Sequence, residues 1–308
     1  MSRYLNPYTD FGFKKLFGEE GTKDLLTDFL NQLLPVHHQI ASLYFKNPEN
    51  LPDLSLERKA IFDIYCQSVT GEQFIVEMQK AKLHFFKDRA LFYSTFPIRG
   101  QAKKGDWDFK LTPIYYVAIL DFKYDEREEQ QKLLREVALR DQDGELFYDK
   151  LHFRFLQMPL FTKQEHELTT HFDKWLYFLK NLSNFDHIPT ILNEPLFQKA
   201  FNILEESNLN PEQLEQYQKN LYTYLELNSA IKTAADDGVE KGRLAGLQQG
   251  LQQGLEKGLV LGLEQGLEKG DKQAREAIAR NLLGVLEVEM IALKTGLSVA
   301  EINALENK

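Results

Sequence analysis

The sequence predicts an α/β protein with an α-helical C-terminal extension. Three observations predict it: two strand-like stretches around a Thr-Gly turn in residues 61–82, a near-continuous apolar run at residues 113–122, and a period-four glycine array at residues 238–270. The first is typical of a β-hairpin and the second of a strand buried on both faces. At 308 residues with 43% hydrophobic content, the chain has room for one α/β domain and a helical extension.

The remaining elements follow from hydrophobic periodicity and from turn and proline signals. In chain order, the patterns first predict a helix over residues 9–35 ended by Pro35, a short strand over 40–45, and hairpin strands over 61–68 and 73–79. They then predict a helix over 83–96 stopped by Pro97 and a strand over 113–122. The remaining predictions are a polar loop or helix over 124–143, a strand over 151–158, and helices over 165–235.

Composition excludes several classes of protein. A charged-then-apolar N-terminal signal is not present, and the longest apolar run, residues 114–120, is too short to span a bilayer. We therefore expect a soluble, cytoplasmic protein without a membrane partner. The single cysteine, Cys66, excludes an internal disulfide and a cysteine-based zinc cluster.

The hairpin loop decides which side chains share a face of the hairpin. If residues 69–71 form a three-residue loop with Gly71 in the left-handed conformation, Asp63 lies opposite Glu77. Asp63, Glu77 and Gln79 then lie together, because side chains two apart in a strand share a face. A loop of two or four residues would send the two carboxylates to opposite faces. We predict the three-residue loop.

Two neighbouring carboxylates on a sheet repel each other and lose hydration, which is costly unless a cation lies between them. Oxygen-only ligation favours Mg²⁺ or Mn²⁺ over zinc, and such an ion can generate hydroxide and polarise a phosphoryl oxygen. The alternative is that Asp63 and Glu77 lie on the solvated face of an amphipathic hairpin. The residues alone leave both interpretations open.

Three stretches of the chain match one family pattern. They are TDFGFKKLFG at residues 9–18, Asp63 followed by EMQ at residues 77–79, and the glycine array. The first resembles the opening signature of the recombination-promoting nuclease/putative transposase family, within the PD-(D/E)XK nuclease superfamily. The second matches its aspartate and Glu-x-Gln pair, and the third is similar to its repetitive tail. The combination is far more specific than an isolated D…ExQ motif.

The resemblance implies a restriction-endonuclease-like fold, a mixed sheet core flanked by helices. It also implies a metal-dependent DNA endonuclease linked to recombination or transposition, in which Asp63 and Glu77 bind Mg²⁺ or Mn²⁺ and Gln79 is the third catalytic residue. Related nucleases sometimes add an acidic ligand from the first helix, where Asp10 stands. The superfamily usually has lysine at the position of Gln79, and glutamine can hydrogen-bond a water but carries no charge. The alternative function is a catalytically weak or inactive nuclease-fold protein that binds DNA or forms oligomers.

Charge is unevenly distributed along the chain. The net charge of −9 counts against simple nucleic-acid binding, but residues 80–104 hold seven basic residues and one acid, a net charge of +6. A basic strip beside a metal site suits a phosphate backbone. Lys80, Lys82 and Arg89 are the candidate DNA contacts, and Lys82 and Arg89 are predicted to share a helix face. The alternative is that these cations solvate that face or form ion pairs.

The tail combines glycines at intervals of four with leucines that each follow a glycine. Because four residues exceed the 3.6-residue turn of an α-helix, the row of glycines and the row of leucines each rotate around the helix by about 40° per repeat. This rotation favours a right-handed supercoil. Each glycine costs about 1 kcal/mol relative to alanine. We therefore predict either a self-associating helix, which would make the protein a homo-oligomer through its C-terminal part, or a disordered, extendable spacer.

Residues 293–305 resemble the turn and second helix of a helix-turn-helix, with Gly296 at the turn and Ser298 as N-cap. Glu301 is the one charge in residues 299–305, so the pattern favours protein packing over DNA reading. The expected organisation is a nuclease-like core at residues 1–164, a helical region at 165–235, the glycine-repeat segment at 236–272 and a small helix-turn-helix-like tail at 273–308.

Overall fold

The structure is a computed structural model that describes residues 2–35, 38–46, 62–102, 108–124 and 131–306. The chain divides into two compact units, Met1–Asn228 and Ser229–Lys308. The six strands of the described residues lie in the first unit, and the second unit is helical.

A mixed six-stranded sheet runs through the first unit in the order β1-β2-β3-β4-β6-β5. Its strands are β1 Leu43–Phe45, β2 Ile64–Ser68, β3 Gln73–Gln79, β4 Ile114–Leu120, β5 Leu134–Arg140 and β6 Leu146–Gln157. The central strands β3, β4 and β6 run parallel, and the outer strands pair antiparallel. The predicted fold class, a mixed sheet with flanking helices and a helical C-terminal extension, is confirmed.

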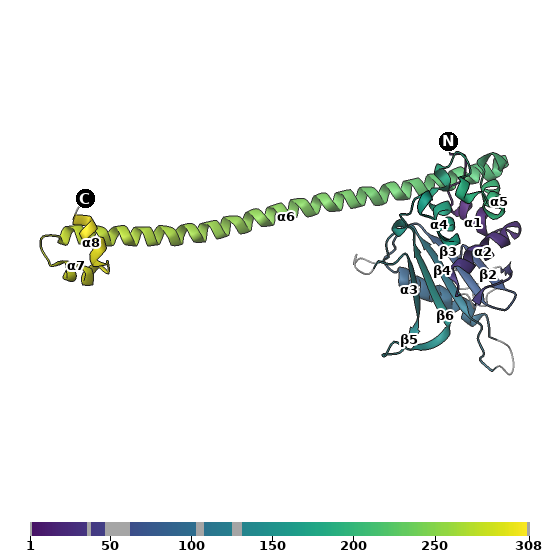
Figure 1. The fold of residues 1–308 in the computed structure, drawn as a ribbon, viewed down its shortest axis with the longest axis horizontal. Helices are drawn as coiled ribbons and strands as arrows, with labels where there is room; N and C mark the ends of the chain where they lie inside the picture. The colour runs from purple at the N-terminus through teal and green to yellow at the C-terminus, as the bar shows by residue number, and fades with distance from the viewer. Residues whose placement is uncertain (1, 36–37, 47–61, 103–107, 125–130, 307–308) are drawn as a thin grey trace, which may run out of the picture. The chain divides into compact units, whose positions relative to one another are not determined.

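Helices cover both faces of the sheet (Figure 1). The larger core lies on the face with α1 Asp10–Phe17, α2 Lys23–Leu33, α4 His171–Asn181 and α5 Pro195–Ile203. The opposite face packs against α3 Phe86–Arg99. Strand β4 is buried on both faces, as predicted, so that Tyr115 belongs to the first core and Tyr116 to the second.

The hairpin register is the predicted one. Ser68 N–H donates to Glu72 O at 2.9 Å, and Gly71 has a φ of 107°, which disfavours other residues. Because Ile64 pairs with Val76, Asp63 lies opposite Glu77. The prediction for residue 61 lies outside the described residues.

The opening signature around α1 forms a tight N-terminal cap. Thr9 Oγ1 accepts a hydrogen bond from Gly12 N–H at 3.0 Å. A Cβ on Gly12 would lie 2.3 Å from the carbonyl oxygen of Asn6, so this position requires glycine. Phe13 and Phe17 point into the core. The signature therefore anchors the helix on which Asp10 stands.

Two helix predictions need correction. The helix predicted over residues 9–35 is two helices, because the first ends at Gly18, whose N–H bonds to Lys14 O at 2.7 Å. The helix predicted to stop at Pro97 continues to Arg99, since the buried Pro97 removes one backbone donor without ending the packed turn. This helix begins at Phe86, so Lys82 precedes it and does not share a helix face with Arg89.

The polar loop or helix predicted over residues 124–143 is also wrong, since part of it is the edge strand β5. This strand pairs with β6, and Glu136 forms an ion pair with Arg154 across the pair. Residues 125–130 of that prediction, and Lys103 and Lys104 of the basic strip, lie outside the described residues.

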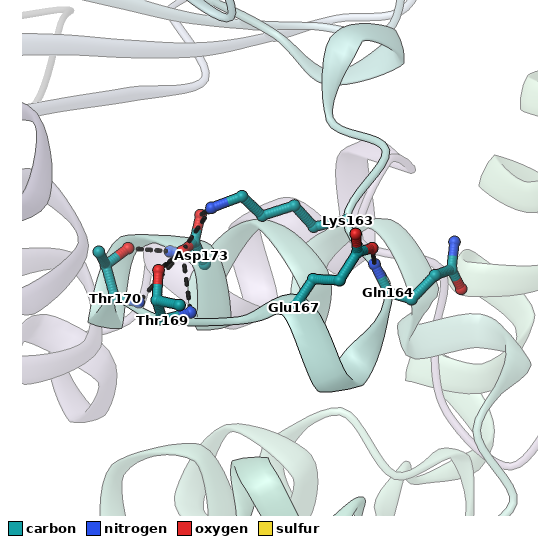
Figure 2. A network of polar contacts seen from close by, with 6 residues as sticks. All are labelled: Lys163, Gln164, Glu167, Thr169, Thr170 and Asp173. Carbon is teal, nitrogen blue, oxygen red and sulfur yellow. Dashed lines mark hydrogen bonds and ion pairs between the residues drawn. The ribbon is translucent and has the colours of Figure 1, made fainter.

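Helix α4 starts at a closed polar network (Figure 2). Asp173 accepts hydrogen bonds from Lys163 Nζ at 2.8 and 2.9 Å, from Thr169 N–H at 3.1 Å and from Thr170 N–H at 3.1 Å. Thr170 Oγ1 in turn accepts from Asp173 N–H at 3.0 Å, which completes a capping box. The start of the helix is thus fixed by partners close by in the chain.

Helix α6, Pro211–Leu282, has its first residues in the first unit, where Tyr224 OH donates to Asp121 Oδ2 at 2.9 Å. The glycines of the array lie in the part of α6 that belongs to the second unit, so the array is helical in the structure. Among the described residues, no atom outside the adjacent helix backbone lies within 4 Å of any of their Cβ positions. The leucines that directly follow a glycine of the array are exposed, from Leu263 at 59% to Leu267 at 74%.

The second unit ends in a small helical cluster. Helices α7 Val288–Thr295 and α8 Val299–Glu306 flank Gly296, which has a φ of 72°. Ser298 Oγ accepts from Glu301 N–H at 3.3 Å, so the predicted turn and N-cap are both present. Ile291 and Ile302 are buried against the end of α6. Across the described residues, no helix combines the length and apolar character needed to cross a membrane.

Candidate metal centre on the β-hairpin

Glu77 lies in β3, in the interior of the sheet, and is 1% exposed. Its Oε2 accepts hydrogen bonds from Gln79 Nε2 at 2.6 Å and from Tyr116 OH at 2.7 Å. Its Oε1 is buried and accepts no hydrogen bond from the described residues. One oxygen of this carboxylate is therefore held in place and the other is bare, although a buried polar atom normally has a partner.

Burial raises the pKa of Glu77 from its ordinary value of 4.5 to about 7. The hydrogen bond from Tyr116 lowers the pKa, the charge of Asp63 raises it, and the charge of Arg89 and the hydrogen bond from Gln79 lower it. Near neutral pH the negative charge of a buried carboxylate of this kind is neutralised either by protonation or by a bound cation.

Asp63 stands directly before β2 and is fixed to the neighbouring strand. Its Oδ2 accepts the backbone N–H of Met78 at 2.8 Å. Burial raises the pKa of Asp63, an effect that this hydrogen bond opposes. Asp63 also lines a cavity of about 390 Å³ together with Asp10, Lys14 and Lys46. The structure thus brings Asp10 into the neighbourhood of Asp63.

Gln79 ends β3 and is 7% exposed. Because an ionised carboxylate only accepts hydrogen bonds, the amide NH₂ of Gln79 faces Glu77. The amide carbonyl oxygen is directed away from Glu77 and can accept a hydrogen bond. The structure therefore brings together the three candidate catalytic residues, Asp63, Glu77 and Gln79, at the open end of the hairpin.

A family model described as PD-(D/E)XK nuclease family transposase matches residues 7–234. The chain belongs to this family. The match contains the opening signature, Asp63, Glu77 and Gln79, and it ends before the glycine array. Neither the curated proteins nor the solved structures contain a significant match to the chain.

Membership makes this a nuclease-type protein of the transposase family, and PD-(D/E)XK nucleases generally use divalent metal ions. The described residues hold no group of three or more His, Cys, Asp or Glu side chains placed for a metal. Mg²⁺ does not require one, because it is usually bound by one or two carboxylates, waters and substrate phosphates. The bare, buried Oε1 of Glu77, a residue that lies opposite Asp63 in the hairpin register, fits such an ion.

The candidate DNA contacts have different surroundings. Lys80 directly follows β3, and its charge lowers the pKa of Asp63. Lys82 is exposed in the segment before α3. Arg89 is half-buried on α3, with its guanidinium carbon 4.9 Å from the centre of the Tyr93 ring, and its Nε donates no hydrogen bond to the described residues. The charge of Arg89 acts on Glu77, so this side chain lies beside the carboxylate site.

Sequence reasoning did not single out Tyr116. It lies inside the apolar run of β4, where the pattern predicts a core residue. The available signal was that a buried tyrosine needs a partner for its hydroxyl, and two adjacent tyrosines in an aliphatic strand require one on each face.

Proposed function

We propose that this protein is a metal-dependent DNA endonuclease that hydrolyses phosphodiester bonds in recombination or transposition. The observation that carries the proposal is the bare, buried Oε1 of Glu77 beside Asp63. An uncompensated carboxylate oxygen in the interior of a sheet is costly, and a divalent cation removes that cost.

Asp63 and Glu77 would hold Mg²⁺, or Mn²⁺ in its place. When bound, the ion supplies positive charge for the phosphoryl oxygen and lowers the pKa of a coordinated water. The carbonyl oxygen of Gln79 accepts a hydrogen bond from the attacking water and orients it. Lys80 and Lys82 contact the DNA phosphates, and Arg89 places a further positive charge beside the carboxylates.

Plasmid cleavage with and without Mg²⁺ tests this function. Asp63→Asn keeps an oxygen to accept the Met78 N–H and removes the charge, so we expect a native fold and loss of cleavage, as for Asp63→Ala. Asp88→Asn, which alters an exposed carboxylate on α3, is the matched control and should cut like the wild type. Mg²⁺-dependent cleavage by Asp63→Asn at the wild-type rate would place the site elsewhere.

A second function is favoured by two observations: the neutral Gln79 at the usual lysine position, and the exposed leucines of α6. In this alternative the nuclease fold is weakly active or inactive, and the protein binds DNA or self-associates through its C-terminal part. Light scattering on the full chain and on a chain that ends at Asp237 tests it. A smaller number of chains per oligomer after truncation supports self-association by the tail, and an unchanged number contradicts it.

A further inference from the structure

We propose that Tyr116 is a positioning residue that holds Glu77 in the orientation in which Oε1 faces the metal ion. This inference rests on the metal site of the proposed function. It assigns a role to a strand residue outside the Asp63, Glu77 and Gln79 set.

Both hydrogen-bond donors to Glu77 act on the same oxygen. Tyr116 OH and Gln79 Nε2 lie 2.7 and 2.6 Å from Oε2, whereas Oε1 is buried without a partner among the described residues. A carboxylate has two equivalent oxygens, so two donors on one of them set the rotation of the whole group. The oxygen left without donors is the one available to a cation.

The hydroxyl of Tyr116 has little freedom to move. Strands β3 and β4 pair in parallel with Ile75 opposite Tyr116, which places Glu77 two residues along the same face. Tyr116 is 1% exposed, and its ring packs against Phe153 with the ring centres 5.9 Å apart. The donor therefore comes from the rigid centre of the sheet and not from a loop.

Glu77 in turn orients Gln79. Since the carboxylate accepts from the amide NH₂, the amide carbonyl oxygen is turned away from Glu77. Tyr116 thus acts on Gln79 through Glu77. In this arrangement glutamine at the usual lysine position provides an oriented acceptor for a water molecule where lysine would provide a charge.

The neighbouring residue Tyr115 offers a matched control. It is also 1% exposed in β4, but it lies on the opposite face, where its hydroxyl is 2.8 Å from His38 Nδ1. Tyr116→Phe and Tyr115→Phe each remove one buried hydroxyl from the same strand. Only the first change should affect the metal site.

The test measures Mn²⁺ affinity of the full-length chain by calorimetric titration, with thermal unfolding as the check on the fold. Ligand-supporting residues typically contribute 10–100-fold to metal affinity or activity. We expect Tyr116→Phe to weaken Mn²⁺ binding by about tenfold or more, and Tyr115→Phe to leave it unchanged. Gln79→Met, which removes the other donor to Oε2, should weaken binding in the same direction and serves if Tyr116→Phe fails to fold.

Cleavage adds a readout that a purely structural role would not change. Tyr116→Phe should need more Mg²⁺ for half-maximal cleavage and recover activity at high Mg²⁺, whereas Asp63→Ala should not recover. A folded Tyr116→Phe with wild-type Mn²⁺ affinity overturns the inference, as does a wild type that binds no Mn²⁺. If the wild type binds Mn²⁺ but does not cut DNA, weaker binding by Tyr116→Phe still supports the inference while the endonuclease function fails.

Discussion

Two buried carboxylates in the first unit have opposite surroundings. Asp173 is 5% exposed and Glu77 is 1% exposed, so both are withdrawn from water. Burial raises the pKa of each, but hydrogen bonds from Lys163, Thr169 and Thr170 outweigh burial at Asp173 and lower its pKa to about 2. At Glu77 burial dominates and the pKa is about 7.

The difference separates a carboxylate with a structural role from one that suits the proposed cation site. Both oxygens of Asp173 receive hydrogen bonds in the network of Figure 2, so neither is bare. Glu77 has two donors on one oxygen and none among the described residues on the other. A structural role satisfies both oxygens, whereas a site that binds a cation keeps one oxygen bare at a cost in stability.

The largest expected effect is that of Glu77→Gln on cleavage. Loss of one of the two proposed metal ligands should reduce Mg²⁺-dependent cleavage by about a thousandfold or more, since a bound ion would supply several kcal/mol to the transition state. Initial rates of plasmid nicking measure it. Cleavage within about tenfold of wild type would show that Glu77 does not hold the ion.

The same substitution should stabilise the metal-free fold at pH 8. The folded state binds more protons than the unfolded state between pH 4.5 and about 7, so the Glu77 contribution to stability falls as pH rises through that window. The raised pKa corresponds to about 3 kcal/mol, of which a new unpaired amide N–H offsets about 1–2 kcal/mol. Urea unfolding should show a gain of about 1–2 kcal/mol at pH 8 that disappears at pH 5.

Asp173→Ala should change the free energy of unfolding in the opposite direction. It leaves Lys163 and the backbone N–H groups of Thr169 and Thr170 without their acceptor, so we expect a loss of about 2–3 kcal/mol in the free energy of unfolding. Because the folded-state pKa is lowered, the wild-type contribution is present above about pH 4 and is lost as pH falls toward 2. Under conditions well below the midpoint of unfolding, the cleavage rate of Asp173→Ala should equal that of the wild type. A free energy of unfolding equal to that of the wild type would contradict the comparison.

The smallest expected effect is that of Gln79→Lys, which gives Glu77 the kind of partner that Lys163 gives Asp173. A neighbouring ammonium group favours the ionised carboxylate, so the pKa of Glu77 should fall by about one unit or more. Mn²⁺ binding competes with protonation of Glu77. The pH range over which the Mn²⁺ affinity rises should therefore shift to lower pH. An unshifted profile would mean that the lysine does not approach Glu77.

The register of the hairpin could be predicted from the sequence because it depends on a local signal, the loop that ends at Gly71. Sequence reasoning did not find β5, because Leu134–Arg140 is an edge strand rich in charge, and it is held by pairing with β6 and not by its own pattern. The contact of Tyr116 with Glu77 could not be predicted from the sequence for a similar reason. The hydroxyl of Tyr116 meets Glu77 only once β3 and β4 are paired in parallel, and the hydrogen bond between the two side chains joins residues 39 apart in sequence.

The three-residue loop of the hairpin has a consequence for the proposed site. Side chains alternate strictly along a strand, so a shift of one residue in the pairing of β2 with β3 would place Asp63 and Glu77 on opposite faces. A change in the turn that moved this register by one residue would therefore separate the two carboxylates without altering either of them. The geometry of the turn therefore constrains the proposed site as firmly as the identity of the two carboxylates does.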